Sequence, residues 1–363
     1  MKLFKLLSIF LLLQPTSAIP VVCYYILNQP RVSEVPIELC SNVILINSAH
    51  ISEKSGSLQI FEPDISEFSE LHEKRKDLQL LVSITSSNPS FSLLTSNPSL
   101  MEQFSRNLTA TLLKFNLNGV DIDWEFPAWS RDAKRADRSN FSMFLKILNS
   151  HLKPQSLTLS VAVPGPPTIS RVAYDVEVLN RYADMVQVMN YDFHVYNKLS
   201  NPVVGFNAPL HPMRAEISVL GEMNVESSMK TWLDTLGLDR NKTIFGIPTY
   251  ARAFQLLTHY LHKPYSPATR SRPEFTNYDD ICELVKNPSY TKVWNRHAQA
   301  PYLYGPSGLW ISYENPESIA AKMDMAKHLK VGGVMVFSIG SDDVTGKCGD
   351  TFPLLKLIAK LAN

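Results

Sequence analysis

Several features that mark other protein classes are missing from this sequence. The net charge is only +1, whereas a dedicated nucleic-acid binder carries a strongly basic face, so we expect no nucleic-acid partner. No glycine-rich phosphate loop follows the first predicted strand, which argues against an open, doubly wound sheet. Internal repeats and low-complexity segments are also absent. What remains is an ordinary globular composition, 45% hydrophobic over 363 residues, which suits one large domain or two modest ones.

Cysteine is scarce. The four cysteines are Cys23, Cys40, Cys282 and Cys348. In a secreted protein an even number suggests two disulfides, for which the sequence alone allows three connectivities. Buried free thiols are the alternative. Pairing Cys23 with Cys40 would close a short loop and contribute on the order of 3 kcal/mol.

The N-terminus carries the one segment that is apolar enough to suggest targeting. Met1 to Ala18 has the pattern of a secretory signal, with Lys2 and Lys5 before an apolar run and small residues at its end. The run is too short to span a bilayer, and no later transmembrane candidate follows. We therefore predict a secreted protein without a membrane anchor after removal of residues 1–18, an uncleaved anchor being the alternative. Glycosylation sequons begin at Asn107, Asn140 and Asn241.

Eight β-rich runs alternate largely with helical patterns. A capping-box pattern at Ser99–Glu102 predicts the start of one of these helices. Runs that are apolar on both faces suit parallel strands covered by helices, and the alternation predicts right-handed crossovers and a (β/α)8 barrel. The runner-up is an open doubly wound sheet. The runs are 21–27, 43–46, 78–84, 118–127, 157–163, 185–192, 243–250 and 332–339.

Residues 251–308 interrupt this rhythm. The segment is rich in proline, tyrosine and arginine and is too long for an ordinary loop between a strand and a helix. We interpret it as an insertion before the last βα unit. The predicted organisation is a signal peptide at 1–18, a barrel at 19–250 and 309–363, and an inserted subdomain at 251–308.

The segment from Asn118 to Pro127 alternates between acids and apolar residues. In a strand, residues two apart share a face, so its three carboxyl groups line one side about 7 Å from one to the next. Burial of that side would raise the pKa of at least one of them, and a protonated carboxyl group near neutral pH is what a general acid needs. The acids are Asp121, Asp123 and Glu125, and the apolar residues are Val120, Ile122 and Trp124.

Two other interpretations of this segment are an exposed strand with an acidic face and a Ca²⁺ or Mg²⁺ site. The spacing fits no metal-binding loop, so we expect no metal and no cofactor. In a barrel, active residues lie at the C-terminal ends of the strands. Glu125, Tyr191, Asp192 and Tyr250 all lie at such ends, so we expect them to converge on one site.

The acidic segment resembles the catalytic strand of family 18 glycoside hydrolases, the chitinases and chitinase-like lectins. Their pattern is Asp-x-x-Asp-x-Asp-x-Glu, and Asn118 stands where the family usually has the first Asp. Met189 to Asp192 matches the family's Met-x-Tyr-Asp, and Gly246 to Phe254 is similar to the segment before its α+β insertion. The resemblance covers nearly all of the mature chain and implies the disulfides Cys23–Cys40 and Cys282–Cys348.

The resemblance also implies a mechanism in which the substrate's own acetamido oxygen attacks the sugar. In that mechanism Glu125 protonates the leaving oxygen. Asp123 orients the acetamide and shares a proton with Asp121, Tyr191 donates a hydrogen bond to the acetamide oxygen, and Asp192 holds the sugar. Further substrate-binding residues are expected at Tyr24, Trp124, Met189, Tyr250, Arg252 and Phe337.

Three departures from the family concern its aromatic residues. Asn47 replaces an aromatic, Thr85-Ser86-Ser87 replaces Gly-Gly-Trp, and Phe337 replaces the Trp under the reacting sugar. Losing indole faces shrinks the surface on which sugars stack. We therefore expect either a secreted, monomeric chitinase-type hydrolase that acts on chitin or N-acetylglucosamine oligosaccharides, or a chitinase-like lectin that binds them without cleavage.

Overall fold

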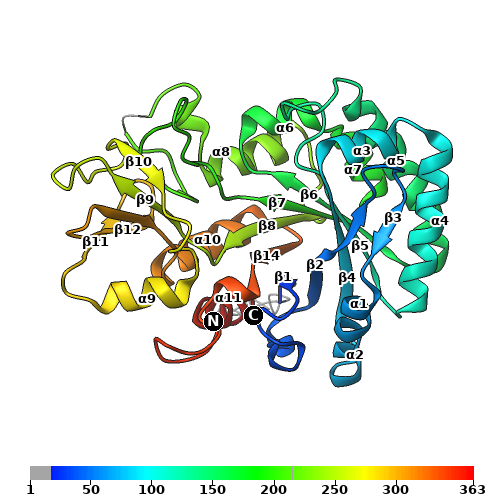
Figure 1. Cartoon of the computed structure of the whole chain (residues 1–363), viewed down its shortest axis with the longest axis horizontal. Coiled ribbons are helices and arrows are strands. Elements are labelled where there is room, and N and C mark those ends of the chain that lie inside the picture. The colour runs from blue at the N-terminus through cyan, green and yellow to red at the C-terminus, as the bar shows by residue number, and fades with distance from the viewer. Residues whose placement is uncertain (1–17, 215) are drawn as a thin grey trace, which may run out of the picture.

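The computed structural model describes residues 18–214 and 216–363, and a closed barrel of eight parallel strands forms its centre (Figure 1). The barrel closes where β1 pairs with β2, which confirms the predicted (β/α)8 fold. Nearly all of the expected signal peptide lies outside the described residues. In barrel order the strands are β1 (Val21–Ile26), β14 (Gly333–Phe337), β8 (Thr243–Pro248), β7 (Met185–Met189), β6 (Thr158–Pro164), β5 (Gly119–Asp123), β4 (Gln79–Thr85) and β2 (Asn42–Ile51).

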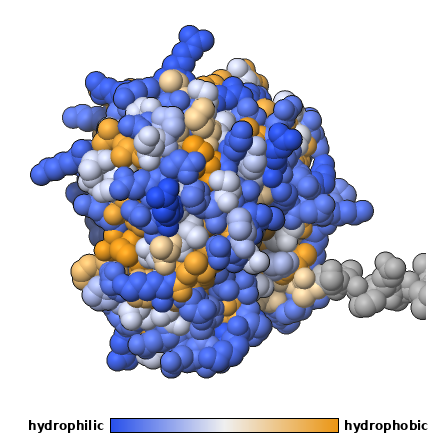
Figure 2. Space-filling model, turned by 90° about the vertical axis from the view of Figure 1, so that its right-hand side faces the viewer, coloured by the Kyte–Doolittle hydropathy of each residue, from blue (hydrophilic) through white to orange (hydrophobic). Residues whose placement is uncertain are grey.

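Helices surround this barrel, and α3, α4 and α5 cover the side drawn at the right of Figure 1. The outer face of that side is largely hydrophilic with small, separate apolar patches (Figure 2). No helix of the described residues is both long enough and apolar enough to cross a membrane. The helices around the barrel are α1 (Glu62–Ser69), α2 (Leu71–Lys74), α3 (Asn88–Thr95), α4 (Pro98–Lys114), α5 (Asp137–Leu152), α6 (Pro167–Ala173), α7 (Val176–Tyr182), α8 (Val225–Lys230), α10 (Pro316–Leu329) and α11 (Pro353–Ala362).

The N-terminal cap of α4 lies two positions before the predicted one. The helix begins at Pro98, and the side chain of Asn97 accepts hydrogen bonds from the backbone N–H groups of Ser99 and Leu100. Proline suits the first turn because it lacks the N–H group that would be unpaired there. The cap is therefore Asn97 and not Ser99.

Alternation along each strand explains why the barrel strands are apolar on both faces. In β1, Val22 and Tyr24 belong to a core cluster inside the barrel. The residues beside them, Cys23 and Tyr25, belong to the larger core between the barrel and its helices. Both faces of a strand are thus removed from water.

A second sheet, antiparallel and five-stranded, lies beside the barrel at the left of Figure 1. The predicted insertion, 251–308, contains four of its strands and α9, while β13 lies just beyond residue 308; the division of the chain into these parts stays a prediction. A short strand, β3 (Leu58–Ile60), pairs antiparallel with β2. In sheet order the strands are β10 (Ala268–Ser271), β9 (Arg252–Leu256), β13 (Leu309–Ser312), β12 (Ala300–Tyr304) and β11 (Thr291–Asn295), and α9 is Tyr278–Lys286.

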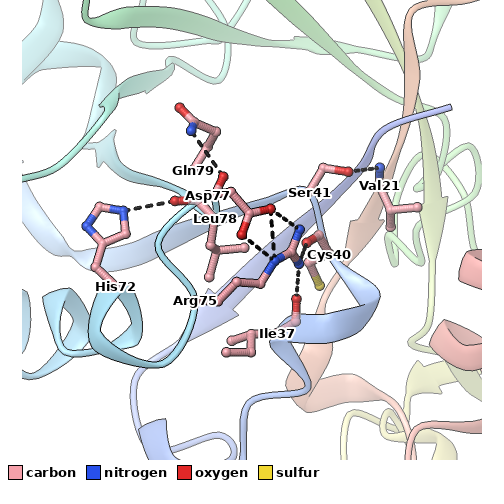
Figure 3. Close-up of polar contacts among 9 residues, drawn as sticks. All are labelled: Val21, Ile37, Cys40, Ser41, His72, Arg75, Asp77, Leu78 and Gln79. Carbon is pink, nitrogen blue, oxygen red and sulfur yellow. Dashed lines mark hydrogen bonds and ion pairs between the residues drawn. The ribbon is translucent and has the colours of Figure 1, made fainter. Parts of the chain in front are cut away.

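Both expected disulfides are present, Cys23–Cys40 and Cys282–Cys348, each with its Cα atoms 6.0 Å apart. Figure 3 shows how Arg75 fixes the loop that the first of them closes. The Arg75 Nη1 donates to the carbonyl oxygens of Ile37 and Cys40 at 2.6 and 2.7 Å. This guanidinium therefore ties the disulfide loop to the turn before β4.

Asn118 lies at the end of β5 opposite to Glu125. Its Oδ1 accepts a hydrogen bond from the Leu80 backbone N–H at 2.8 Å and contacts the His72 Nε2 at 3.0 Å. The side chain therefore links β5 to β4 and α2, and this departure from the family pattern is remote from the acids at the other end of the strand.

A buried ion pair stabilises the start of α10. The side chains of Lys322 and Glu314 are 0% and 3% exposed, and the Lys322 Nζ donates to both carboxylate oxygens at 2.9 and 2.8 Å. Ser318 donates a further hydrogen bond to Glu314. Removing one partner would leave an uncompensated charge away from water.

We predict that Lys322→Met lowers the free energy of unfolding by about 3–5 kcal/mol, because Glu314 is left buried and unpaired. Urea unfolding followed by circular dichroism measures the change. Lys327→Met removes an exposed lysine from the same helix and should change stability by less than about 0.5 kcal/mol. Equal stability of the two variants would contradict this account.

Candidate active site

A cavity of about 660 Å³ opens at the C-terminal ends of the barrel strands. It brings together nine of the eleven residues that the sequence places in the active site, while Asp121 and Trp124 do not line it. The nine come from β1, β5, β7, β9, β14 and the segments that follow β5, β7 and β8. They are Tyr24, Asp123, Glu125, Met189, Tyr191, Asp192, Tyr250, Arg252 and Phe337.

Asp121 and Asp123 of β5, and Glu125 just after it, lie at successive depths of the barrel. Asp121 is 0% exposed, and its Oδ2 accepts hydrogen bonds from the hydroxyl groups of Tyr24 and Ser83, both at 2.9 Å. Asp123 and Glu125 line the cavity above it. An exposed strand with an acidic outer face is therefore excluded.

Burial raises the pKa of all three acids. The pKa of Asp123 lies well above its usual range, chiefly because of burial and further because of the charges of Glu125 and Asp121. Glu125 faces the cavity, yet the surrounding protein raises its pKa, and the charge of Asp192 adds to the effect. For Asp121, burial outweighs the hydrogen bonds that lower its pKa. Such coupled acids titrate as a group, and this environment favours a proton on one of them near neutral pH.

Asp192 is held in place by three neighbours. Its φ of 58° is left-handed, a conformation that Asp tolerates better than most residues, and its backbone N–H donates to the Asn207 Oδ1 at 3.0 Å. The Asp192 Oδ1 accepts hydrogen bonds from the Tyr250 hydroxyl at 2.7 Å and from the Arg252 Nε at 2.8 Å. Because Arg252 begins β9, this ion pair joins the barrel to the antiparallel sheet.

Phe337 lies among three tyrosines on the cavity wall. Its ring centroid is 5.5 Å from that of Tyr24, 5.7 Å from that of Tyr191 and 6.1 Å from that of Tyr250. The Tyr191 hydroxyl makes only a weak contact, 3.7 Å to the Met335 sulfur. An apolar ring surface and a nearly free hydroxyl group therefore lie beside the acids.

The expectation that Trp124 binds substrate is wrong. Its side chain is 1% exposed and stacks on Phe91 with ring centroids 4.8 Å apart. Its Nε1 donates to the Asn88 Oδ1 at 2.8 Å. Trp124 alternates with Asp123 and Glu125 along the chain, so it lies on the outer side of β5 and packs against the helices.

The sequence analysis missed part of the cavity wall. Pro164, the last residue of β6, and the following Gly165 and Pro166 line the cavity, and a Cβ atom at Gly165 would lie 2.5 Å from the Met189 carbonyl oxygen. The Pro-Gly-Pro sequence at the C-terminal end of a predicted strand could have indicated that these residues lie in the cavity wall. The other missed wall residues, Ile26, Ile46, Phe126, Ala162, Ile169, Val195, Thr276 and Ser341, carry no such mark.

Two departures from the family pattern lie in the cavity wall. Asn47 and Thr85 both line the cavity, and Asn47 has a left-handed φ of 68°. His50 bridges the two positions, because its ring nitrogens contact the carbonyl oxygens of Thr85 at 2.8 Å and of Asn47 at 3.1 Å. Next to Thr85, Ser87 caps α3 by accepting from the Ser90 backbone N–H. This part of the wall is therefore polar, and His50 links its two sides.

One cluster in the described part of the chain has the spacing of metal ligands. It consists of Cys282, Cys348 and Asp343. The two sulfur atoms are bonded to each other, and the Asp343 carboxylate accepts hydrogen bonds from the backbone N–H groups of Lys347 and Cys348. Because the sulfur atoms form a disulfide and the carboxylate binds backbone N–H groups, this cluster does not form a metal site.

Comparison with known families identifies the architecture. The family model for Glycosyl hydrolases family 18 matches residues 20–342. The chain belongs to this family. It is 26% identical to an endochitinase of Manduca sexta over 96% of this chain and 68% of that protein. It is 28% identical to the oviduct-specific glycoprotein of Sus scrofa over 89% of this chain and 63% of that protein.

Solved structures of the family superpose closely on this chain. The Group IV chitinase of Ostrinia furnacalis has a TM-score of 0.86 and is 28% identical, with 94% of this chain and 99% of that chain covered. Human YKL-39, described as a pseudo-chitinase with retained chitooligosaccharide binding, has a TM-score of 0.84 at 22% identity, with 95% and 99% covered. The latter likeness concerns the fold alone. Proteins described as chitinases and as pseudo-chitinases therefore share this fold.

We predict that Asp123→Asn raises the melting temperature at pH 7. The pKa of Asp123 in the folded state is raised above its ordinary value of 3.8, so its ionisation disfavours folding as the pH rises from that value through the folded-state pKa. The gain should be complete above the folded-state pKa and absent below 3.8. In domains of 150–250 residues about 1 kcal/mol corresponds to roughly 2–4 °C, and in this larger chain we expect a rise of about 2 °C for each kcal/mol.

Thermal unfolding at several pH values checks this prediction. Asp132→Asn, which changes an exposed acid in the loop after β5, is the matched control and should leave the melting temperature unchanged. The account is contradicted if Asp123→Asn still raises the melting temperature below pH 3.8, or lowers it at pH 7. Either result would show that ionisation of Asp123 does not destabilise the folded protein.

Proposed function

We propose that this protein is a secreted chitinase-type glycosidase that cleaves β-1,4-linked N-acetylglucosamine polymers with retention of configuration. The observation that carries the proposal is the position of Glu125, a carboxyl group at the cavity wall with a raised pKa and two buried acids beneath it. Membership of family 18 supports the same conclusion. Chitin or its oligosaccharides would be the ligand, and the proposed enzyme acts as a monomer without a cofactor or metal.

Secretion is proposed together with the activity. Two disulfides suit an oxidising compartment. The sequon residues Asn107 and Asn241 are exposed, so a glycan attached at either would not disturb the core. The N-terminal signal pattern gives the route.

In the proposed reaction Glu125 donates its proton to the glycosidic oxygen. The acetamido oxygen of the same sugar attacks the anomeric carbon as the bond to the leaving oxygen breaks, which gives an oxazolinium ion. The Glu125 carboxylate then takes a proton from the water that attacks the anomeric carbon, and the acetamide is restored with retention. The raised pKa of Glu125 supports the first step, because it favours the protonated form.

The neighbouring groups have proposed roles in orienting the acetamide. One oxygen of Asp121 and one of Asp123 are buried without a hydrogen-bond partner in the described part of the chain, so a proton shared between these acids would satisfy both. Asp123 would accept from the acetamide N–H, and the weakly engaged Tyr191 hydroxyl would donate to the acetamide oxygen. Asp192, fixed by Arg252, would hold a sugar hydroxyl.

A second candidate function is carbohydrate binding without hydrolysis. Its supporting observation is the smaller aromatic surface of the cavity. Asn47 lines the cavity where the family usually has an aromatic residue, and Phe337 lines it where the family usually has Trp. The proposed lectin would bind chitin oligosaccharides in the same cavity.

We predict that Glu125→Gln reduces the turnover of N-acetylglucosamine pentamer by about 100- to 10,000-fold, the usual contribution of a general acid. Chromatography of the products measures turnover, and calorimetry on the same preparation should show that binding persists. Asp132→Asn is again the matched control and should keep full activity. Binding without turnover by the wild type selects the lectin, and absence of both eliminates the two functions.

The affinity for chitin oligosaccharides should follow the ring at position 337. Phe337→Trp enlarges the apolar face and should tighten binding by about 2- to 10-fold, the range that a good aromatic contact gives. Phe337→Ala should weaken binding by a similar factor or more. Calorimetry in the Glu125→Gln background measures both without interference from hydrolysis. If the three residues bind equally, Phe337 does not contact the sugar.

A further inference from the structure

The pairing of β4 with β5 places hydroxyl groups beside carboxyl groups in two successive layers. In the parallel register, Ser83 is the neighbour of Asp121, and Thr85 is the neighbour of Asp123. Neighbouring strands are about 4.8 Å apart, so side chains at matched positions on the same face are within reach. In the deeper layer this neighbourhood gives a hydrogen bond, since the Ser83 Oγ donates to the Asp121 Oδ2 at 2.9 Å.

The upper layer contains the same two chemical groups without the bond. The Thr85 Oγ1 and the Asp123 Oδ1 are both buried, and neither has a hydrogen-bond partner in residues 18–214 and 216–363. Buried polar atoms without partners are rare in folded proteins. A threonine hydroxyl can donate its hydrogen to a carboxylate, and a rotation of the Thr85 or Asp123 side chain would bring the two oxygens into hydrogen-bonding geometry. Both residues line the cavity, so this pair lies where ligand would bind.

We propose that Thr85 is a positioning residue that donates a hydrogen bond to the ionised carboxylate of Asp123. The bond stabilises the charged form of Asp123 and fixes the orientation of its free oxygen toward the cavity. The shared proton with Asp121 and the bond from Thr85 are two alternative ways to satisfy Asp123, one for the protonated pair and one for the ionised acid. The family tends to have glycine at the position of Thr85, so this hydroxyl group is a feature of the present chain.

The other groups that face Asp123 do not supply such a donor to its charge. Asp121 and Glu125 on its own strand raise its pKa by repulsion. Tyr24 from β1, Tyr191 after β7 and Tyr174 after α6 are close enough for the charge of Asp123 to add to the effect of burial in raising their own pKa values. The Tyr24 hydroxyl already donates to Asp121, and the Tyr174 hydroxyl donates to the Trp124 carbonyl oxygen. The Tyr191 hydroxyl makes only a weak contact to the Met335 sulfur, and the proposed mechanism assigns it to the acetamide oxygen. Thr85 is therefore the neighbour with a hydroxyl group that has neither a partner in the described residues nor another proposed role.

The test is a titration of Asp123 in the intact protein with Thr85→Val and Thr85→Ser. Carboxyl-carbon NMR of aspartate-labelled protein follows the titration, and Asp123→Asn assigns the signal. A hydrogen bond to a charged group corresponds to a shift of about one pH unit. Thr85→Val, which keeps the shape and removes the donor, should raise the apparent pKa of Asp123 by that amount, and Thr85→Ser should restore the wild-type value.

Kinetics then links the bond to the proposed function, on which this part of the inference rests. If ionised Asp123 orients the acetamide, the acidic limb of kcat/KM should move to higher pH by the same amount in Thr85→Val and not in Thr85→Ser. The titration does not need turnover, so an inactive wild type would defeat the proposed hydrolase and leave the role of Thr85 to the NMR result. The proposal is overturned if Thr85→Val leaves the titration of Asp123 unchanged, or if Thr85→Ser shifts it equally.

Discussion

The interior of a closed eight-stranded barrel holds few side chains, and the character of this molecule depends on which residues β5 places there. Most inward positions of the other strands are apolar, such as Val22, Ile44 and Leu81. The deepest acid, Asp121, is therefore excluded from water, and Asp123 is largely buried at the cavity wall. Exclusion of water disfavours charge, so the carboxyl groups keep protons at a pH where exposed acids would have lost them. The same burial that works against stability prepares the site for acid–base chemistry.

The fold was predictable because the chain alternates between two recognisable patterns, that of a buried strand and that of an amphipathic helix. Strands apolar on both faces, alternating with amphipathic helices, have few other arrangements than a barrel. The acids of β5 were predictable for the same reason, since alternation puts Asp121, Asp123 and Glu125 on one face. The convergence of Tyr191 and Asp192 with Glu125 followed from the rule that strand ends meet at one side of a barrel.

What the sequence did not reveal depends on packing and on loops. Trp124 was assigned to the site on the strength of the family pattern, although its place between two acids in the alternation puts it on the opposite face. Ile169, Val195 and Thr276 line the cavity from loops or short helices whose course no periodicity predicts. The ion pair of Lys322 with Glu314 was not predicted either, because lysine is usually exposed and no sequence pattern marks this one as buried.

The contact between Asp192 and Arg252 limits how the chain can be rearranged. Arg252 is the first residue of the antiparallel sheet, yet its guanidinium fixes an acid that belongs to the barrel. A chimera that replaced this sheet with one from another protein would remove one wall of the cavity along with it. Such an exchange has to keep Tyr250 and Arg252 with the barrel and place its junction after them. The sheet can therefore be replaced only from the residue that follows Arg252.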